Sequence, residues 1–262
     1  MKHRDIIYTR QEGIATITLN RPELLNAFSL EMRDSIVRAV KDASKDDGVR
    51  VLVITGAGRA FSSGGNVKNT IERMSQRSQT ERSNKGRQFQ PSIILRNFDK
   101  PVIAAINGVA AGGGLDLALS CDIRIASDKA RFSEVYIRRG IIPPTGGTYL
   151  LPRLVGIDKA CLLIWTGDMV DAKEAERIGL VTMVVPHSEL ENATKELADK
   201  LAKGPPLAIR RAKRAIYEGL AMEMEPALKV ASSLVRELWG TEDHEEGLRA
   251  FIEKREPVFK GK

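Results

Sequence analysis

The segment AAGGGLDLALSCD, residues 110–122, joins a strand-like run to an apolar helix-like run through three consecutive glycines. A glycine turn of this kind lets the backbone approach a ligand and leaves the first N–H groups of the helix unpaired. Such groups attract negative charge, yet Asp116 stands just inside the helix. The segment matches neither the phosphate-binding P-loop nor the pattern GxGxxG. It therefore leaves two interpretations open, which are anion binding and close packing of strand against helix.

A second glycine loop favours anion binding. The segment ITGAGRAFSSGGNVK, residues 54–68, also follows a buried strand-like run and also contains small residues and glycine. Two such loops in one domain can present two converging N–H groups. That arrangement is an oxyanion hole, which stabilises an enolate or a tetrahedral anion on a carbonyl oxygen.

The pattern around the two loops predicts a layered α/β fold. Strand-like runs alternate with amphipathic helices up to about residue 157, and the remainder of the chain is helical. We expect an α/β core over residues 1–200 and a helical C-terminal region over residues 201–262. The predicted strands lie within residues 13–20, 49–56, 100–109 and 121–127, and the predicted helices within residues 29–44 (N-cap Ser29), 171–179 (ending at Gly179) and 188–204 (N-cap Ser188).

Composition narrows the classes of function. The chain has 262 residues, 42% of them hydrophobic and 29% charged, as in an ordinary globular protein. Two distant cysteines and three scattered histidines predict neither a disulfide framework nor a metal site. No apolar run predicts a leader or a membrane span, so we expect a cytoplasmic protein without a membrane partner. The net charge of +7 suits a polyanionic ligand, but the basic stretch 73–87 lacks the aromatic residues that stack on bases, so we do not expect nucleic acid as a partner.

Five long motifs together resemble the crotonase superfamily, also called the enoyl-CoA hydratase/isomerase family. The resemblance covers almost the whole chain. It implies a ββα spiral core of the ClpP-like kind and a helical C-terminal trimerisation region in a homo-trimer or hexamer. It also implies an acyl-CoA thioester substrate, with coenzyme A as part of that substrate and with no separate cofactor. The motifs are LNRPELLNAFS (19–29), GAGRAFSSGGNVK (56–68), KPVIAAINGVAAGGGLDLALSCDIRIAS (100–127), RFSEVYIRRGIIPPTGGTYLLPRLVG (131–156) and FIEKREPVFKGK (251–262).

The same resemblance assigns the binding positions. The two oxyanion N–H groups fall on Gly65 and Gly113. The lysine that meets the CoA phosphates, often from a neighbouring subunit, falls on Lys254, and a solvated terminal lysine is the other interpretation. The remaining positions expected to contact CoA, largely through the backbone, are Ala27, Ala60, Ser63 and Gly64.

The acid–base positions depart from the family pattern. Hydratases of the family carry two glutamates, whose positions are occupied here by Asp116 and Tyr136. An aspartate that some members use falls on Pro144. Tyr136 cannot act as a carboxylate base, because the reference pKa of its hydroxyl is near 10. If residues 131–137 are extended, Glu134 shares a face with Tyr136 and could substitute for the missing glutamate.

Each of these residues also has a structural interpretation. Asp116 could cap the start of its helix, Tyr136 could be a wall of the acyl pocket, and Glu134 could lie at the surface or in an interface. We predict an enzyme that stabilises a thioester enolate, best described as a hydratase-like lyase. Isomerisation, decarboxylation and thioester hydrolysis by the same chemistry are alternatives, and non-catalytic RNA binding is a remote one.

Overall fold

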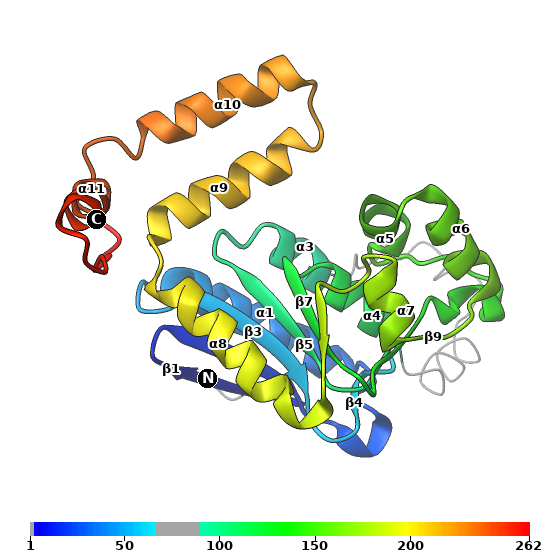
Figure 1. Ribbon diagram of the computed structural model, residues 1–262. Helices are drawn as coiled ribbons and strands as arrows, with labels where there is room; N and C mark the ends of the chain where they lie inside the picture. The colour runs from blue at the N-terminus through cyan, green and yellow to red at the C-terminus, as the bar shows by residue number, and fades with distance from the viewer. Residues whose placement is uncertain (1–2, 66–89) are drawn as a thin grey trace, which may run out of the picture.

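The computed structural model describes residues 3–65 and 90–262. It contains two β-sheets, helices that cover them, and a C-terminal helical arm that extends away from the sheets (Figure 1). This architecture confirms the predicted α/β fold with a helical C-terminal part. The basic stretch 73–87 lies outside the described residues. Across the two described ranges, none of the helices has the length and apolar character needed to cross a membrane.

The larger sheet has the strand order β1-β2-β3-β5-β7-β10. Strands β1 and β2 pair antiparallel, and every other neighbouring pair is parallel. The central strands are apolar on both faces, as expected when helices cover both sides of a parallel sheet. Their bounds are β1 Ile6–Gln11, β2 Ile14–Leu19, β3 Val51–Gly56, β5 Val102–Ile106, β7 Ile123–Ser127 and β10 Met183–Val185.

The smaller sheet has the order β4-β6-β8-β9. The pairs β3–β4, β5–β6 and β7–β8 each place their first strand in the larger sheet and their second in the smaller one. This repeated step makes the chain spiral, and it brings the loops that follow successive strands to one region. The strands are β4 Ala60–Ser62, β6 Val109–Ala111, β8 Arg131–Ser133 and β9 Val170–Asp171.

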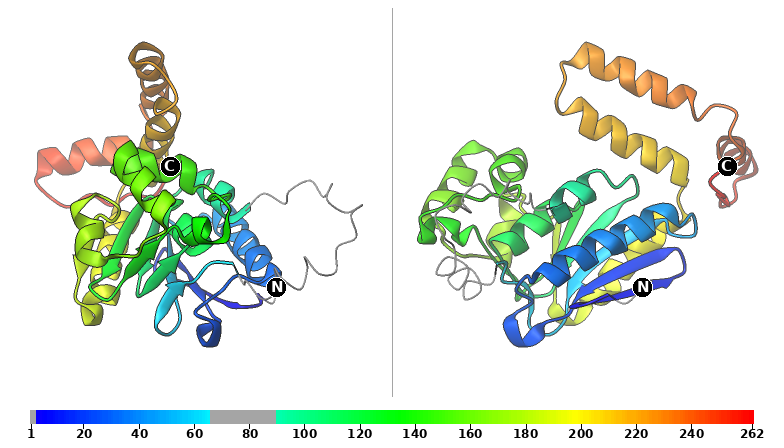
Figure 2. Two further views of the ribbon diagram at one scale, coloured as in Figure 1. Left: turned by 90° about the vertical axis from the view of Figure 1, so that its right-hand side faces the viewer. Right: turned by 180° about the vertical axis from the view of Figure 1, so that it is seen from behind.

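Helices cover both faces of the larger sheet. Helix α1 packs on β1 and β2 from one side, whereas α8 packs on β3, β5 and β7 from the other, and the views from front and back show the two helices on opposite faces (Figure 2). Most of the buried apolar core lies on the α1 side. The helices before the arm are α1 Leu30–Lys45, α3 Gln90–Arg96, α4 Gly113–Leu119, α5 Gly147–Val155, α6 Ile157–Thr166, α7 Ala172–Arg177 and α8 Leu190–Lys203, with 3₁₀-helices at Pro22–Leu24, Val135–Arg139 and His187–Glu189.

The helix caps test the sequence predictions directly. Ser29 is the N-cap of α1, and its hydroxyl accepts a hydrogen bond from the Met32 N–H, as predicted. The prediction that Ser188 caps the next long helix is wrong. Ser188 lies inside the 3₁₀-helix that precedes α8, whereas an N-cap residue needs a non-helical backbone. Helix α8 ends before Gly204, as predicted.

The arm consists of α9 Pro206–Gly219, α10 Met224–Arg236 and α11 Glu242–Glu253. Helices α9 and α10 pack against each other, and α11 lies at the far end of the molecule from α4 and α5 (Figures 1 and 2). Helix α9 is tied to the core by Asp122, which accepts hydrogen bonds from Lys213 at 2.7 Å and from the Tyr217 hydroxyl.

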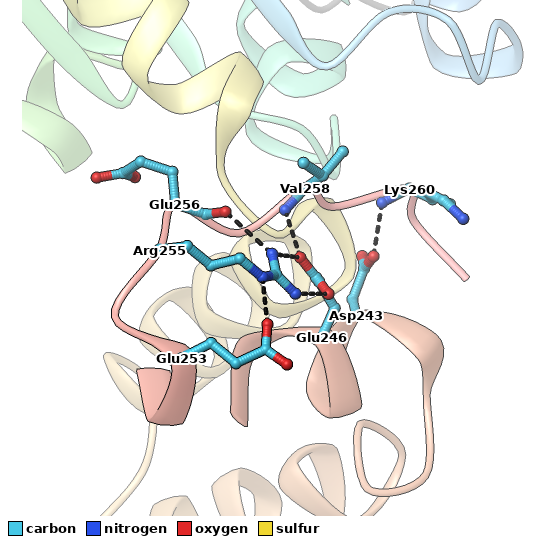
Figure 3. A network of polar contacts seen from close by, with 7 residues as sticks. All are labelled: Asp243, Glu246, Glu253, Arg255, Glu256, Val258 and Lys260. Carbon is cyan, nitrogen blue, oxygen red and sulfur yellow. Dashed lines mark hydrogen bonds and ion pairs between the residues drawn. The ribbon is translucent and has the colours of Figure 1, made fainter. Parts of the chain in front are cut away.

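The C-terminal tail folds back on α11 (Figure 3). Arg255 forms a two-pronged ion pair with Glu246, at 2.6 and 2.8 Å. The buried carboxylate of Asp243 accepts hydrogen bonds from the N–H groups of Lys260 and Gly261, at 2.6 and 2.9 Å. These contacts give the last residues of the chain a defined path.

Candidate active site

The two glycine loops are packed against each other. Gly64 has φ +82°, and a Cβ at this position would fall 2.5 Å from the Ala111 oxygen and 2.8 Å from the Gly113 nitrogen. A Cβ on Gly114 would fall 2.2 Å from the Ser62 oxygen. Real Cβ atoms are excluded at such distances, so only glycine allows this approach. The packing interpretation therefore holds for Gly64 and Gly114.

The predicted oxyanion donors differ from these packing glycines. Neither the Gly65 N–H nor the Gly113 N–H donates a hydrogen bond to another described residue. A Cβ on Gly65 would have no described atom within 4 Å, whereas one on Gly113 would lie 3.2 Å from the Phe28 ring and 3.4 Å from the Tyr136 hydroxyl. Within residues 3–65 and 90–262, both N–H groups therefore remain available, and Gly113 borders the side chain of Tyr136.

Asp116 is completely buried in the first turn of α4. The capping interpretation is wrong, because Gly112 occupies the N-cap and the carboxylate of Asp116 binds groups outside the helix. Its Oδ2 accepts a hydrogen bond of 2.8 Å from the Tyr136 hydroxyl and another from the Thr145 hydroxyl. Its Oδ1 has no hydrogen-bond partner among the described residues.

Tyr136 lies in the 3₁₀-helix after β8 and is 8% exposed. Its hydroxyl also lies 3.1 Å from the Thr145 hydroxyl, so Asp116, Tyr136 and Thr145 form a closed triangle of polar contacts. Burial, followed by the neighbouring Asp116 charge, raises the pKa of Tyr136. Tyr136 therefore stays protonated and donates its hydrogen bond to Asp116, which goes beyond the role of a pocket wall.

Glu134 stands between β8 and the same 3₁₀-helix. The conditional prediction of an extended segment over residues 131–137 is wrong, because strand geometry ends at Ser133. The surface interpretation of Glu134 is also wrong, since the residue is completely buried. Both of its carboxyl oxygens lack a hydrogen-bond partner among the described residues.

The carboxyl groups of Asp116 and Glu134 both lie next to Gly147, the first residue of α5. A Cβ built on Gly147 would fall 2.6 Å from Asp116 Oδ1 and 2.6 Å from Glu134 Oε1. The two oxygens are therefore separated by at most twice that distance. Because glycine has no side chain, both carboxyl groups can lie against the backbone of residue 147.

Burial changes the protonation of this acid pair. Loss of water around the carboxylate raises the pKa of Asp116 to about 6, although the Thr145 and Tyr136 hydroxyls and the nearby Gly147 N–H oppose that rise. Burial, together with the Asp116 charge, raises the pKa of Glu134 to about 9. At neutral pH the pair therefore holds one proton, on Glu134, and one negative charge, on Asp116. A buried base beside a buried acid can move protons in opposite directions.

The predicted CoA positions lie where the 3₁₀-helix Pro22–Leu24 meets the first glycine loop. Several of their backbone groups are already used within the chain. The Ser63 N–H donates to the Leu25 oxygen at 2.9 Å, and the Gly64 oxygen accepts from the Phe28 N–H at 2.7 Å. The Ala27 N–H donates to the Leu24 oxygen, the Ala27 oxygen accepts from Arg21, and the Ala60 oxygen accepts from Asn26 and Asn107.

Lys254 is separated from this region within one chain. It is the exposed C-cap of α11, with φ +54°, and α11 lies at the opposite end of the molecule from α4 (Figure 1). The structure thus gathers Gly65, Gly113, Asp116, Glu134 and Tyr136 in one region and leaves Lys254 apart.

Sequence reasoning missed Thr145 and Gly147. Both lie in PPTGGT, residues 143–148, inside the motif 131–156 that contributes to the family resemblance. A hydroxyl beside two glycines was the available signal. It did not reveal that the hydroxyl reaches Asp116, 29 positions earlier in the chain.

The spiral α/β fold thus places a buried acid pair close to two packed glycine loops. The family model described as enoyl-CoA hydratase/isomerase matches residues 9–262. The chain belongs to this family, within the crotonase superfamily.

Full-length relatives agree with this assignment. The chain is 39% identical to a short-chain-enoyl-CoA hydratase of Clostridium acetobutylicum, with 97% of each chain covered. It is 36% identical to a crotonyl-CoA hydratase of Syntrophomonas wolfei, with 99% of each covered. The crystal structure of an enoyl-CoA hydratase from Bacillus anthracis superimposes with a TM-score of 0.92 at 36% identity, covering 99% of this chain and 100% of the other.

Proposed function

We propose that this protein adds water across the double bond of 2-enoyl-CoA thioesters. The observation that carries the proposal is the buried acid pair beside Gly113, in a chain whose full-length relatives are named as enoyl-CoA hydratases. Hydration needs a base for water and an acid for carbon. An ionised Asp116 and a neutral acid close to it meet both needs.

The reaction starts with water beside Asp116. The carboxylate takes a proton from the water, the water oxygen bonds to C3 of the acyl chain, and the double-bond electrons move onto the thioester oxygen. This produces an enolate. Protonation at C2 then restores the thioester and gives the 3-hydroxyacyl-CoA, so the product contains every atom of the enoyl-CoA and the water.

The enolate oxygen is the atom that needs stabilisation. We assign this role to the N–H groups of Gly65 and Gly113, which are free of other described partners. A single donor of this kind is typically worth about 10²–10³ in rate. Their placement on the two glycine loops supports the assignment.

The proposal also concerns the coenzyme A portion of the substrate and the oligomeric state of the protein. Coenzyme A enters as part of the substrate, and the chemistry requires no metal or redox cofactor, because the conjugated thioester itself accepts the electrons. CoA binding by Ala27, Ala60, Ser63 and Gly64 stays a prediction, as does a cytoplasmic location. Exposed apolar residues on the arm, including Met224, Phe251 and Ile252, support a homo-trimer or hexamer in which Lys254 serves a neighbouring site.

One observation favours a second reaction of the same enolate. Tyr136 stands where the resemblance places a glutamate, so the site differs from that of a two-glutamate hydratase. Isomerisation, decarboxylation or thioester hydrolysis are the corresponding alternatives. RNA binding receives no support from the described residues.

Product analysis tests the proposal. The purified protein is incubated with crotonyl-CoA and with a panel of longer 2-enoyl-CoA thioesters, and the masses of the products are measured by mass spectrometry. Hydration adds the mass of one water to the intact thioester. An unchanged mass with a moved double bond would indicate isomerisation instead. Loss of carbon dioxide from a carboxyacyl-CoA would indicate decarboxylation, and release of free coenzyme A would indicate thioester hydrolysis.

A further inference from the structure

We propose that Glu134 is the second acid of the site and delivers the proton to C2, while Asp116 takes the proton from water. The inference rests on the proposed hydratase function and deepens it. The family resemblance assigns its second glutamate to position 136, where this chain has Tyr136. The inference places the second carboxyl group two residues earlier, on Glu134.

Asp116 is held through one of its two carboxylate oxygens. Two hydroxyl groups, from Tyr136 and Thr145, donate to the same carboxylate oxygen, Oδ2. A carboxylate fixed on one oxygen presents the other in a defined direction. Here that other oxygen, Oδ1, lies against Gly147. Tyr136 and Thr145 are therefore positioning residues that leave Oδ1 of Asp116 as the reacting atom.

Glu134 supplies the second carboxyl group at this place. Its Oε1 lies against the same point of Gly147 as Asp116 Oδ1. A completely buried carboxyl group normally has hydrogen-bond partners, since leaving it unpaired costs free energy. Glu134 has none among the described residues on either oxygen. An acid kept buried and unpaired beside a second acid is typical of a functional site.

The space beside Gly147 presents three carboxyl oxygens to a ligand. Asp116 Oδ1 and the two oxygens of Glu134 can together accept or donate several hydrogen bonds, and none of them is used within the described residues. A water molecule and the reacting end of an enoyl thioester offer the matching groups. The absence of a side chain at Gly147 keeps this space free.

Protonation supports the division of labour between the two carboxyl groups. The groups that face Glu134 are Asp116 from α4, the Tyr136 hydroxyl and, through Asp116, the Thr145 hydroxyl. The Asp116 charge adds to burial in keeping the proton on Glu134, whereas the two hydroxyls help Asp116 to ionise. A single proton shared by the pair therefore resides on Glu134.

The proton balance closes over one turnover. Asp116 gains a proton when the water oxygen bonds to C3, and Glu134 loses a proton when C2 is protonated. After these two steps the single proton of the pair is on Asp116, whereas it was on Glu134 at the start. Transfer of that proton from Asp116 to Glu134 across Gly147 restores the starting state, and the higher pKa of Glu134 drives it in this direction. No co-reactant is needed.

The test compares Glu134→Gln with the unmodified enzyme, with Glu196→Gln as the matched control because Glu196 is exposed on α8. Glutamine has the size of glutamate but cannot deliver a proton to carbon. We expect kcat for crotonyl-CoA hydration to fall by about 10²–10⁴-fold in Glu134→Gln, with KM nearly unchanged. Glu134→Asp keeps the acid but shortens its reach, so it should recover part of the lost rate.

A second measurement isolates the C2 step. Butyryl-CoA, which has no double bond to hydrate, is incubated in deuterated water, and exchange at C2 is followed by mass spectrometry. Exchange should be lost in Glu134→Gln and kept in the control. Wild-type kcat or wild-type exchange in folded Glu134→Gln would overturn the proposal and would leave Asp116 to return its own proton. An unmodified enzyme that exchanges C2 but forms no hydrated product would reject the hydratase function while leaving the role of Glu134 intact.

Discussion

The hydroxyl of Tyr136 donates a hydrogen bond of 2.8 Å to the carboxylate of Asp116. These two residues occupy the positions at which the family resemblance expects a pair of glutamates. The relation between them is therefore one of donor and acceptor, and only one of them can take a proton.

Asp116→Asn should remove most of the hydration activity, by about 10²–10⁴-fold, because an amide of similar size cannot accept a proton from water. The amide oxygen can still accept from Tyr136 and Thr145, so the fold should be retained. Steady-state kinetics with crotonyl-CoA measures the loss. Asp34→Asn, an exposed change on α1, should keep full activity, and equal rates in the two variants would remove Asp116 from the mechanism.

Tyr136→Phe and Thr145→Val should shift the acidic limb of the pH–rate profile to higher pH. Both hydroxyls lower the pKa of Asp116, which burial alone would raise further. Losing one of them makes the carboxylate harder to ionise, and a hydrogen bond to a charged group contributes about 1.5–3 kcal/mol. The profile of kcat/KM between pH 5 and 8 checks this. An acidic limb that stays in place would contradict the positioning role.

Glu134→Gln should make the fold more stable at neutral and alkaline pH. The folded protein keeps the Glu134 proton up to about pH 9, whereas the unfolded chain releases it near the ordinary value of 4.5. The unfolded state thus binds fewer protons in this range, and stability falls as pH rises through it. Thermal unfolding from pH 5 to 9 should show a smaller fall in the variant than in the unmodified protein. Parallel curves would show that Glu134 is not a buried neutral acid.

Gly64→Ala should separate the two glycine loops. Its Cβ would collide with the Ala111 oxygen and the Gly113 nitrogen, at a backbone φ that disfavours any side chain. If Gly113 supplies an oxyanion N–H, the rate should fall by about 10²–10³. Gly219→Ala is the control, since its Cβ meets only Ala227 at 3.6 Å. Full activity in a folded Gly64→Ala variant would argue against the oxyanion assignment.

Asp243→Ala should release the C-terminal tail from α11. The substitution removes the buried acceptor of the Lys260 and Gly261 N–H groups. Glu245→Ala removes a neighbouring, exposed acid from the same first turn, so it controls for the helix dipole. Digestion with carboxypeptidase, followed by mass spectrometry, should proceed faster in Asp243→Ala alone. Equal rates would show that these two bonds do not hold the tail.

Local sequence was sufficient for the fold class, the family and the position of the first acid. Strand-like runs, glycine turns and helix caps depend on neighbouring residues, and the N-cap Ser29 was identified correctly on that basis. The roles of Gly113 and Asp116 come from the family resemblance and stay predictions. Ser188 failed as a cap for a local reason too, because the 3₁₀-helix that contains it was not visible in the pattern of apolar residues.

Tertiary structure decided which acids lie next to each other. Thr145 and Tyr136 meet Asp116 across 29 and 20 positions of the chain, and Glu134 and Asp116 both lie against Gly147. A glutamate in the sequence predicts an exposed charge, since burial of a lone carboxylate is costly. Burial depends on atoms contributed by α4, β8 and α5 together, and the same burial moves the pKa of Glu134 above neutrality. The residues of the acid pair could therefore be named from the sequence, whereas their protonation and their partnership arise from the desolvation that folding imposes.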